Sequence, residues 1–136
     1  MLVCYIFNFF KRVLMNKEQT YANKNIFKPK DSVCVITGGS SGIGLALIKI
    51  LLERKAKKII NIDIKKSNLS NVDFYNCNVG SNEDVKKTIA SIYNKYSHID
   101  LFCCNAGIAR DDDAFASVEH WDKVIKTNIL QHTNIV

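Results

Sequence analysis

Three features of the sequence predict an α/β fold built on a parallel sheet. Strand-like apolar runs alternate with helix-like segments from Asp31 onward. The first run, Ser32–Ile36, is apolar after its first residue, as expected for a strand that helices cover on both faces. A glycine-rich turn, residues 37–44, follows it directly and leads into a segment with helical apolar spacing. Because strands that alternate with helices form parallel sheets joined by right-handed crossovers, we expect that architecture here.

The same patterns set the bounds of each element. The expected strands are Ser32–Ile36, Lys58–Ile62 with Asp63 at its end, Asp73–Cys77 and Ile99–Cys103. The expected helices are Leu45–Arg54, Asn82 to Tyr96, and Val118 to the end of the chain. Asn82 is the predicted N-cap of the second helix because two acidic residues, Glu83 and Asp84, follow it. One face of that helix carries Val85, Ile89, Ile92 and Tyr96, and one face of the last helix carries Trp121, Val124, Ile125, Asn128 and Ile129.

These elements predict an incomplete, Rossmann-type doubly wound parallel sheet of about four strands in the order 3-2-1-4. Only nine residues, Ile64–Val72, link the second and third strands, so we expect a loop or a single turn there instead of a crossover helix. Residues 1–30 are expected to form an N-terminal extension, an apolar leader followed by a basic polar linker that ends near Pro29. Residues 31–136 are expected to form the domain, truncated on its C-terminal side relative to a complete doubly wound sheet.

Composition and charge limit the class of protein. With 47% hydrophobic and 24% charged residues, the chain has the composition of a soluble globular domain. The net charge of +6 would suggest a nucleic-acid partner if it lay on the domain. Residues 1–30 hold six basic residues and one acidic residue, however, whereas residues 31–136 hold 13 basic and 12 acidic ones. Because the excess charge belongs to the extension, we expect no nucleic-acid partner.

The cysteines point to thiols in a reducing compartment. The chain contains Cys4, Cys34, Cys77, Cys103 and Cys104, an odd number without a Cys-x-x-Cys pair. All but the first lie in apolar, strand-like runs, so we expect buried, reduced side chains and a cytoplasmic protein instead of disulfides or a zinc site. The acidic run Asp111–Asp113 lies in the loop Ala109–Ser117, and we expect it to be solvated because adjacent carboxylates converge poorly on a metal ion.

The leader Met1–Phe10 is apolar and aromatic, and Lys11 and Arg12 follow it. It is too short to span a bilayer, which takes about twenty residues. A secretory signal would place its positive charge before the apolar run. Three interpretations stay open: an interfacial anchor that gives residues 1–14 a peripheral contact with a membrane surface, a disordered leader, or translation that begins at Met15.

The glycine-rich turn is the most informative segment of the chain. It reads Thr37-Gly38-Gly39-Ser40-Ser41-Gly42-Ile43-Gly44. Gly38 allows the tight turn after the strand, Gly42 lets the backbone approach a pyrophosphate, and Gly44 lets the helix pack close to the strand. The N–H groups at the start of the helix then face the phosphates. A plain glycine-serine turn has the same composition, but the strand before it and the helix after it favour dinucleotide binding.

Asp63 is the candidate ribose-binding residue. It ends the second strand, nineteen residues after Gly44. A carboxylate there accepts hydrogen bonds from both ribose hydroxyls of the adenosine half and repels a 2′-phosphate. Lys65 and Lys66 lie nearby and weaken the distinction, so NAD is favoured over NADP without excluding it. The alternative for Asp63 is a turn residue at the end of a strand.

From Val33 to about Val136 the chain resembles the N-terminal half of the short-chain dehydrogenase/reductase superfamily. Four features match that family in order: the motif Thr37-Gly38-x-x-x-Gly42-x-Gly44, Asp63 at the ribose position, Asn105-Ala106-Gly107 after the fourth strand, and Asn128 in a helix twenty-one residues after Gly107. The resemblance implies that these residues, together with Asn78 and Val79, surround a nicotinamide coenzyme.

Two positions depart from the family pattern. Cys104 stands where the family usually has Asn, and Asn78 stands where it commonly has Asp. The change at Asn78 is mild because an amide oxygen still accepts a hydrogen bond from an adenine amino group. Cys104 loses one polar contact at the end of the central strand.

The resemblance implies an oxidoreductase that moves a hydride between NAD(P) and a small-molecule alcohol or carbonyl substrate. In the family a Ser polarises the substrate oxygen, a Tyr transfers its proton, and a Lys four residues after that Tyr lowers the Tyr pKa. The fourth residue after each tyrosine of this chain is Phe9, Asn25, Val79, Ser97 or Asp100. We therefore expect these residues alone to be inactive. Asn128 is the one catalytic position that the resemblance assigns: its side chain is expected to replace a helix hydrogen bond so that a backbone carbonyl holds a relay water.

Two classes of function stay open. The chain represents either the coenzyme half of an NAD-dependent oxidoreductase or a non-catalytic dinucleotide-binding or interaction fragment. A downstream Tyr-x-x-x-Lys would distinguish them. Association into a homo-oligomer also stays open, because the outer edge of the fourth strand is expected to be unpaired.

Overall fold

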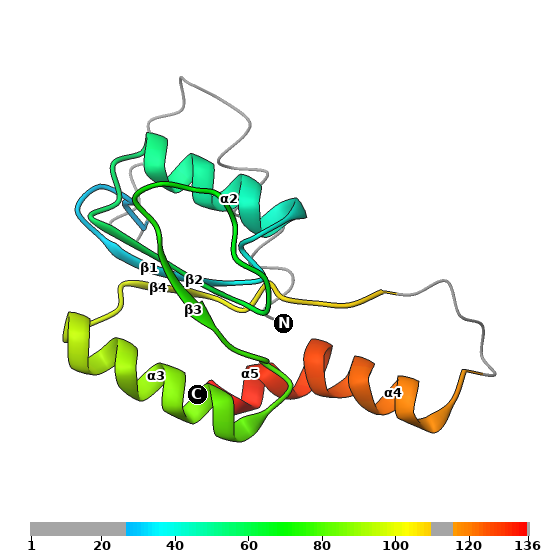
Figure 1. The fold of residues 1–136 in the computed structure, drawn as a ribbon. Coiled ribbons are helices and arrows are strands. Elements are labelled where there is room, and N and C mark those ends of the chain that lie inside the picture. The colour runs from blue at the N-terminus through cyan, green and yellow to red at the C-terminus, as the bar shows by residue number, and fades with distance from the viewer. Residues whose placement is uncertain (1–26, 110–115, 136) are drawn as a thin grey trace.

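Figure 1 shows the fold of the computed structural model, which describes residues 27–109 and 116–135. Four parallel strands form one sheet in the order β3-β2-β1-β4, which confirms the predicted order. The strands are β1 (Val33–Thr37), β2 (Lys58–Asp63), β3 (Asp73–Asn76) and β4 (Leu101–Cys103). Each bound lies within two residues of the predicted one.

Helices cover both faces of the sheet. Helix α2 (Gly42–Glu53) lies on one face, whereas α3 (Asn82–Tyr96) and α5 (Gln131–Asn134) lie on the other (Figure 1). All five residues of β1 are buried, as its apolar sequence predicts. Toward α2, Cys34 and Ile36 pack with Leu47, Ile48 and Leu51. Toward α3, Val33 and Val35 pack with Val85 and Ile92. The two cores hold β1 rigidly, and with it the turn that follows.

Two helix starts differ from the prediction. Helix α2 begins at Gly42, three residues early, because the end of the glycine turn already forms its first turn. The N-cap of α3 is Ser81, so the prediction of Asn82 was wrong by one residue. The Ser81 hydroxyl accepts a hydrogen bond from the N–H of Asp84 at 3.3 Å, which is the usual capping contact. No helix interrupts residues 64–72, which confirms the expected loop.

The last predicted helix is helical throughout but irregular. Helix α4 (Val118–Ile125) passes into the π-helical segment η1 (Lys126–Leu130) before α5 begins. No residue of α4 or η1 is buried. The predicted apolar face is present, with Trp121, Ile125 and Ile129 exposed on it. Within the described residues, therefore, these three apolar side chains stay largely uncovered.

Cys34, Cys77 and Cys103 are buried, as predicted, whereas Cys104 is only half-buried, and all four are free thiols. Cys4, the leader 1–14 and Asp111–Asp113 lie outside the described residues. In residues 27–109 and 116–135, no helix has both the length and the apolar character needed to cross a bilayer. In those ranges no three His, Cys, Asp or Glu side chains gather as metal ligands.

Candidate dinucleotide-binding site

The turn between β1 and α2 is fastened to β2 by three successive amides. The N–H of Gly38 donates to the carbonyl of Ile62 at 2.8 Å. The N–H of Gly39 donates to Asn61 Oδ1 and that of Ser40 to Asp63 Oδ2, each at 3.0 Å. Strand β2 therefore holds the first half of the turn in place through one carbonyl and two side chains.

The second half of the turn leaves its amides unused. Within the described residues, the N–H groups of Gly42, Ile43 and Gly44 have no hydrogen-bond acceptor, and the Ser41 side chain does not cap the helix. They are the first three amides of α2, where the helix dipole also favours an anion. A Cβ on Gly42 would meet nothing within 4 Å. Gly42 and Ile43 are exposed, whereas Gly44 is buried, so an anion could approach this helix start from the side of Gly42 and Ile43.

Close packing explains the last glycine of the motif. A Cβ on Gly44 would lie 2.2 Å from the carbonyl oxygen of Gly38 and 2.6 Å from Asn105 Nδ2. No side chain fits there, so α2 starts directly against the end of β1. This confirms the packing role that the sequence predicts for Gly44.

Asp63 lies beside the turn, at the carboxyl end of β2. Its Oδ2 accepts the Ser40 N–H, and its Oδ1 accepts the N–H of Lys65 at 3.0 Å. The Ser40 hydroxyl donates to the carbonyl of Lys65. The side chain is only partly buried, so its remaining lone pairs are open to a ligand.

Thr37 joins the ends of β1 and β4. Its Oγ1 accepts the N–H groups of Asn105 at 2.8 Å and Ala106 at 2.9 Å, and it lies 3.1 Å from Gln131 Oε1, to which it donates. Asn105 Nδ2 donates back to the carbonyl of Thr37 at 3.0 Å. These bonds join Thr37 to the Asn105-Ala106-Gly107 segment. The two motifs, which are far apart in the sequence, therefore form one hydrogen-bonded unit.

Gln131 is a residue of this unit that the sequence analysis missed. It is 1% exposed, and its Nε2 donates to the carbonyl of Ala106 while its Oε1 accepts from Thr37. The carboxamide thus fastens α5 to both strand ends. A buried Gln with both polar ends paired is a specific connector. Its only signal in the sequence was a polar residue three positions after Asn128.

Asn128 lies in η1, and its side chain binds the segment after β4. Its Oδ1 accepts the N–H of Ile108 and its Nδ2 donates to the carbonyl of Ile108, both at 2.9 Å. We expected the Asn128 side chain to replace a hydrogen bond of its own helix, and that prediction was wrong. Both the oxygen and the nitrogen of the carboxamide bond to the backbone of Ile108 instead. The irregularity is instead in the helix backbone, which adopts π hydrogen bonding at this point.

Asn78 and Val79 border the site beyond β3. Val79 is buried, whereas Asn78 is exposed and its Oδ1 accepts the N–H of Gly80 at 3.0 Å. This local bond fixes the direction of the Asn78 carboxamide. One lone pair of Oδ1 and both hydrogens of Nδ2 stay available to a base.

Comparison with known proteins decides the family. The sequence matches the short chain dehydrogenase family over residues 32–136. The chain belongs to the short-chain dehydrogenase family. It is 36% identical over 115 residues to the 3-oxoacyl-[acyl-carrier-protein] reductase FabG of Thermotoga maritima, an alignment that covers 76% of this chain and 46% of that protein. It is 39% identical over 83 residues to sorbitol-6-phosphate 2-dehydrogenase of Klebsiella pneumoniae, which covers 58% of this chain and 31% of the relative.

Solved structures agree with this assignment. Ligand-free aldohexose dehydrogenase from Thermoplasma acidophilum superposes with a TM-score of 0.73 at 27% identity, over 79% of this chain and 42% of that one. A 4-hydroxyisoleucine dehydrogenase complexed with NADH gives a TM-score of 0.68 at 25% identity, over 76% of this chain and 46% of that one. The chain therefore spans about half the length of the family members that it matches, or less.

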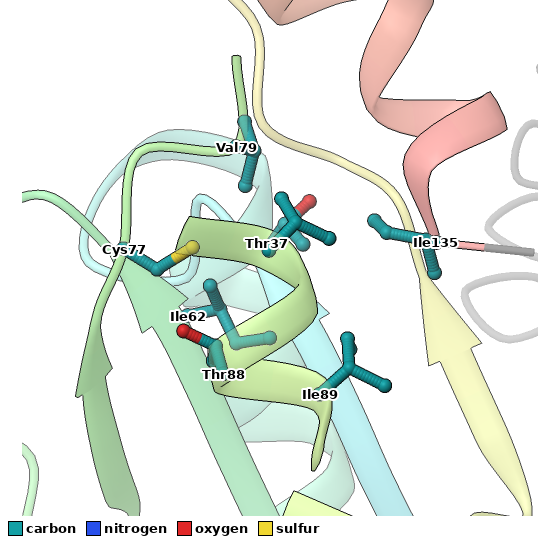
Figure 2. A pocket seen from close by; sticks show the side chains of 8 residues that line it. Thr37, Ile62, Cys77, Val79, Thr88, Ile89 and Ile135 are labelled. Carbon is teal, nitrogen blue, oxygen red and sulfur yellow. The ribbon is translucent and has the colours of Figure 1, made fainter. Parts of the chain in front are cut away.

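Apolar side chains line a small space beside the candidate site. Figure 2 shows Thr37 of β1, Ile62 of β2, and Thr88 and Ile89 of α3 around this space, with Ile135, which follows α5, on another side. Besides these residues the space is lined by Cys77, Val79 and Val85. It is too small and too apolar for a dinucleotide. The candidate site is the open edge formed by the turn, Asp63 and Asn105.

The two cysteines at the end of β4 give a prediction for alkaline pH. Burial raises the pKa of Cys103 from its ordinary value of 9.0 to about 12 and the pKa of Cys104 to about 11. The unfolded chain therefore releases these protons from about pH 9 upward, while the folded chain still holds them. Because the folded state then binds more protons, its free energy of unfolding should fall as the pH rises above about 9.

Urea unfolding at several pH values between about 8 and 10.5 measures this fall. The matched control is the double variant Cys103→Ala/Cys104→Ala, which keeps every other titrating group. Its profile should be flatter than that of the unmodified chain. Parallel profiles would contradict the assigned cause.

Proposed function

We propose that this chain binds NAD and forms the coenzyme-binding part of a short-chain dehydrogenase that acts on an alcohol or carbonyl substrate. One observation carries the proposal: among the described residues the first three amides of α2 have no acceptor, the first two of them belong to exposed residues, and the turn before them binds the Asp63 carboxylate. The residues fit a dinucleotide because the amides suit a pyrophosphate and the carboxylate suits a ribose. Dehydrogenase and reductase names among the relatives support the reaction class.

The residues of the candidate site would divide the work of holding the coenzyme. Gly42, Ile43 and Gly44 hold the phosphates, and Thr37 with Asn105 fixes the strand ends against which the coenzyme lies. Asn128 holds the backbone of Ile108, in the segment that follows Asn105-Ala106-Gly107. A bound nicotinamide would supply the hydride acceptor or donor.

The coenzyme preference rests on Asp63. Asp63→Asn keeps the shape of the side chain and one of its two oxygen acceptors but removes its negative charge. We expect NAD to bind about fivefold more weakly, because a hydrogen bond to a neutral group is worth less than one to a carboxylate. NADP should bind more tightly, because the repulsion of its 2′-phosphate is removed. Titration calorimetry with both coenzymes measures the change.

The matched control is Asp73→Asn. Asp73 begins β3, at the opposite end of the sheet, and pairs with Lys95 at 2.7 Å. It should leave both affinities unchanged. Equal responses of NAD and NADP to Asp63→Asn would contradict the ribose assignment.

The alternative function is dinucleotide binding without catalysis. No tyrosine of this sequence is followed four residues later by lysine, the pair that the family uses for proton transfer. We propose that chemistry requires residues beyond these 136. With NAD and simple alcohols the chain should therefore bind the coenzyme without producing NADH, which absorbance follows directly. Production of NADH would instead show that these 136 residues contain a group that transfers the proton.

A further inference from the structure

We propose that Asn61 is a positioning residue that sets the preference of this chain for NAD over NADP by acting through Ser40. The inference rests on the proposed function, because it concerns the coenzyme that the turn and Asp63 bind. No sequence motif includes Asn61, which lies within an apolar strand.

The Asn61 side chain is buried, and both ends of its carboxamide form a hydrogen bond with the turn. It is 0% exposed in the middle of β2. Its Oδ1 accepts the Gly39 N–H at 3.0 Å, and its Nδ2 donates to the Ser40 hydroxyl at 2.9 Å. A Cβ on Gly39 would lie 2.5 Å from the same Oδ1, so the turn lies directly against the carboxamide.

Packing does not explain a polar side chain at this position. Asn61 is on the α2 side of the sheet, where Ile59 of the same strand packs with Ile48 and Leu51. Ile48 lies next to Asn61, because the same absent Cβ of Gly39 would also meet the Ile48 side chain. An apolar residue of similar size would suit this layer, whereas burial of an amide is unfavourable unless both ends are paired. An Asn at this position forms two hydrogen bonds with the turn, which a Leu cannot form.

Ser40 carries the connection to the ribose-binding segment. Its hydroxyl has one hydrogen, which it donates to the carbonyl of Lys65, so it must accept from Asn61. Its N–H donates to Asp63, which also accepts from the Lys65 N–H. A chain of bonds thus runs from Asn61 through Ser40 to both Asp63 and Lys65. This chain fixes the carboxylate that distinguishes a ribose hydroxyl from a 2′-phosphate.

Loss of the Asn61 carboxamide should therefore affect the two coenzymes unequally. With Ser40 no longer held, Asp63 is less firmly placed. NAD then loses a preorganised acceptor for its ribose hydroxyls. NADP loses only what the two coenzymes share, the placement of the turn by the bond from the Gly39 N–H to Asn61, because its 2′-phosphate makes no favourable contact with that carboxylate.

Calorimetric titration of the full chain with NAD and NADP tests this directly. For Asn61→Leu we expect NAD affinity to fall about tenfold and NADP affinity to fall about twofold, so that the preference narrows about fivefold. The control is Ile59→Ala, which weakens the same face of the same strand and makes no bond to the turn. It should leave the ratio of the two affinities unchanged, so general destabilisation cannot imitate the effect.

The variant Ser40→Ala removes the hydroxyl that links Asn61 to Lys65, at a less buried position, and keeps the backbone N–H that donates to Asp63. It should narrow the preference for NAD over NADP to a similar extent. In the Ser40→Ala background, Asn61→Leu should narrow it no further, because Asn61 acts through the missing hydroxyl. If Asn61→Leu does not fold, Ser40→Ala decides alone.

An unchanged ratio in Ser40→Ala, or equal losses for NAD and NADP in Asn61→Leu, overturns the inference while the proposed function stands. An unmodified chain that binds neither coenzyme overturns both.

Discussion

Gly44→Ala should abolish coenzyme binding and destabilise the fold. The new methyl group would lie 2.2 Å from the Gly38 carbonyl oxygen, and backbone at that position cannot move aside cheaply. The start of α2 must shift away from β1, which we expect to cost about 3 kcal/mol of unfolding free energy and at least about a hundredfold in NAD affinity. Urea unfolding and titration calorimetry measure the two losses.

Gly42→Ala separates binding from folding and is the matched comparison. Its methyl group would enter open space, and only the positive φ of 51° opposes it, at about 1 kcal/mol. The fold should therefore persist while NAD affinity falls about as far as in Gly44→Ala. Unchanged NAD affinity in a folded Gly42→Ala variant would show that the pyrophosphate does not lie against this turn.

Thr37→Val should cause the largest loss of stability among the isosteric substitutions. Valine matches threonine in shape but has no hydroxyl, so the amides of Asn105 and Ala106 and the Gln131 oxygen lose their partner together. Because Thr37 is 0% exposed, water cannot replace it. We expect the unfolding free energy to fall by about 4 kcal/mol, since each buried unsatisfied group costs about 1–3 kcal/mol.

Thr88→Val is the control for Thr37→Val. Thr88 is 9% exposed in α3, and its hydroxyl lies within hydrogen-bond reach of the Cys77 thiol. Its replacement should cost about 1 kcal/mol and leave NAD affinity unchanged. Similar losses in both variants would contradict the role of Thr37 as the junction of β1 and β4.

The sequence predicted the parts of the site that depend on backbone pattern. The alternation of apolar runs and helical segments gave the strand order, and the glycine spacing located the turn and the helix that starts at its end. Asp63 was predictable because the end of the second strand must lie beside the end of the first in a parallel sheet. In each case the order of strands and helices along the chain, or the spacing of a short motif, is enough to make the prediction.

The two buried carboxamides were not predictable in the same way. Asn61 lies within an apolar strand and Gln131 within the last helix, and neither has a partner near it in sequence. Their partners, Gly39 and Ser40 for one and Thr37 and Ala106 for the other, are brought to them only by the crossovers of the fold. A one-dimensional pattern shows that such residues are polar without showing what they bind.

Periodicity also fails to show whether a face is covered. Trp121, Ile125 and Ile129 share a face, as their spacing predicts, yet all three are exposed. The spacing depends only on the geometry of the helix, whereas burial depends on a second element.

The most direct test of this account is calorimetric titration of the unmodified chain with NAD, alongside the Gly42→Ala variant. We expect saturable binding of NAD at one site per chain, with an affinity at least about a hundredfold lower in the variant while its unfolding transition is retained. Absence of binding to a folded unmodified chain, or equal binding by the two, would contradict the claim that the free amides of α2 hold a dinucleotide.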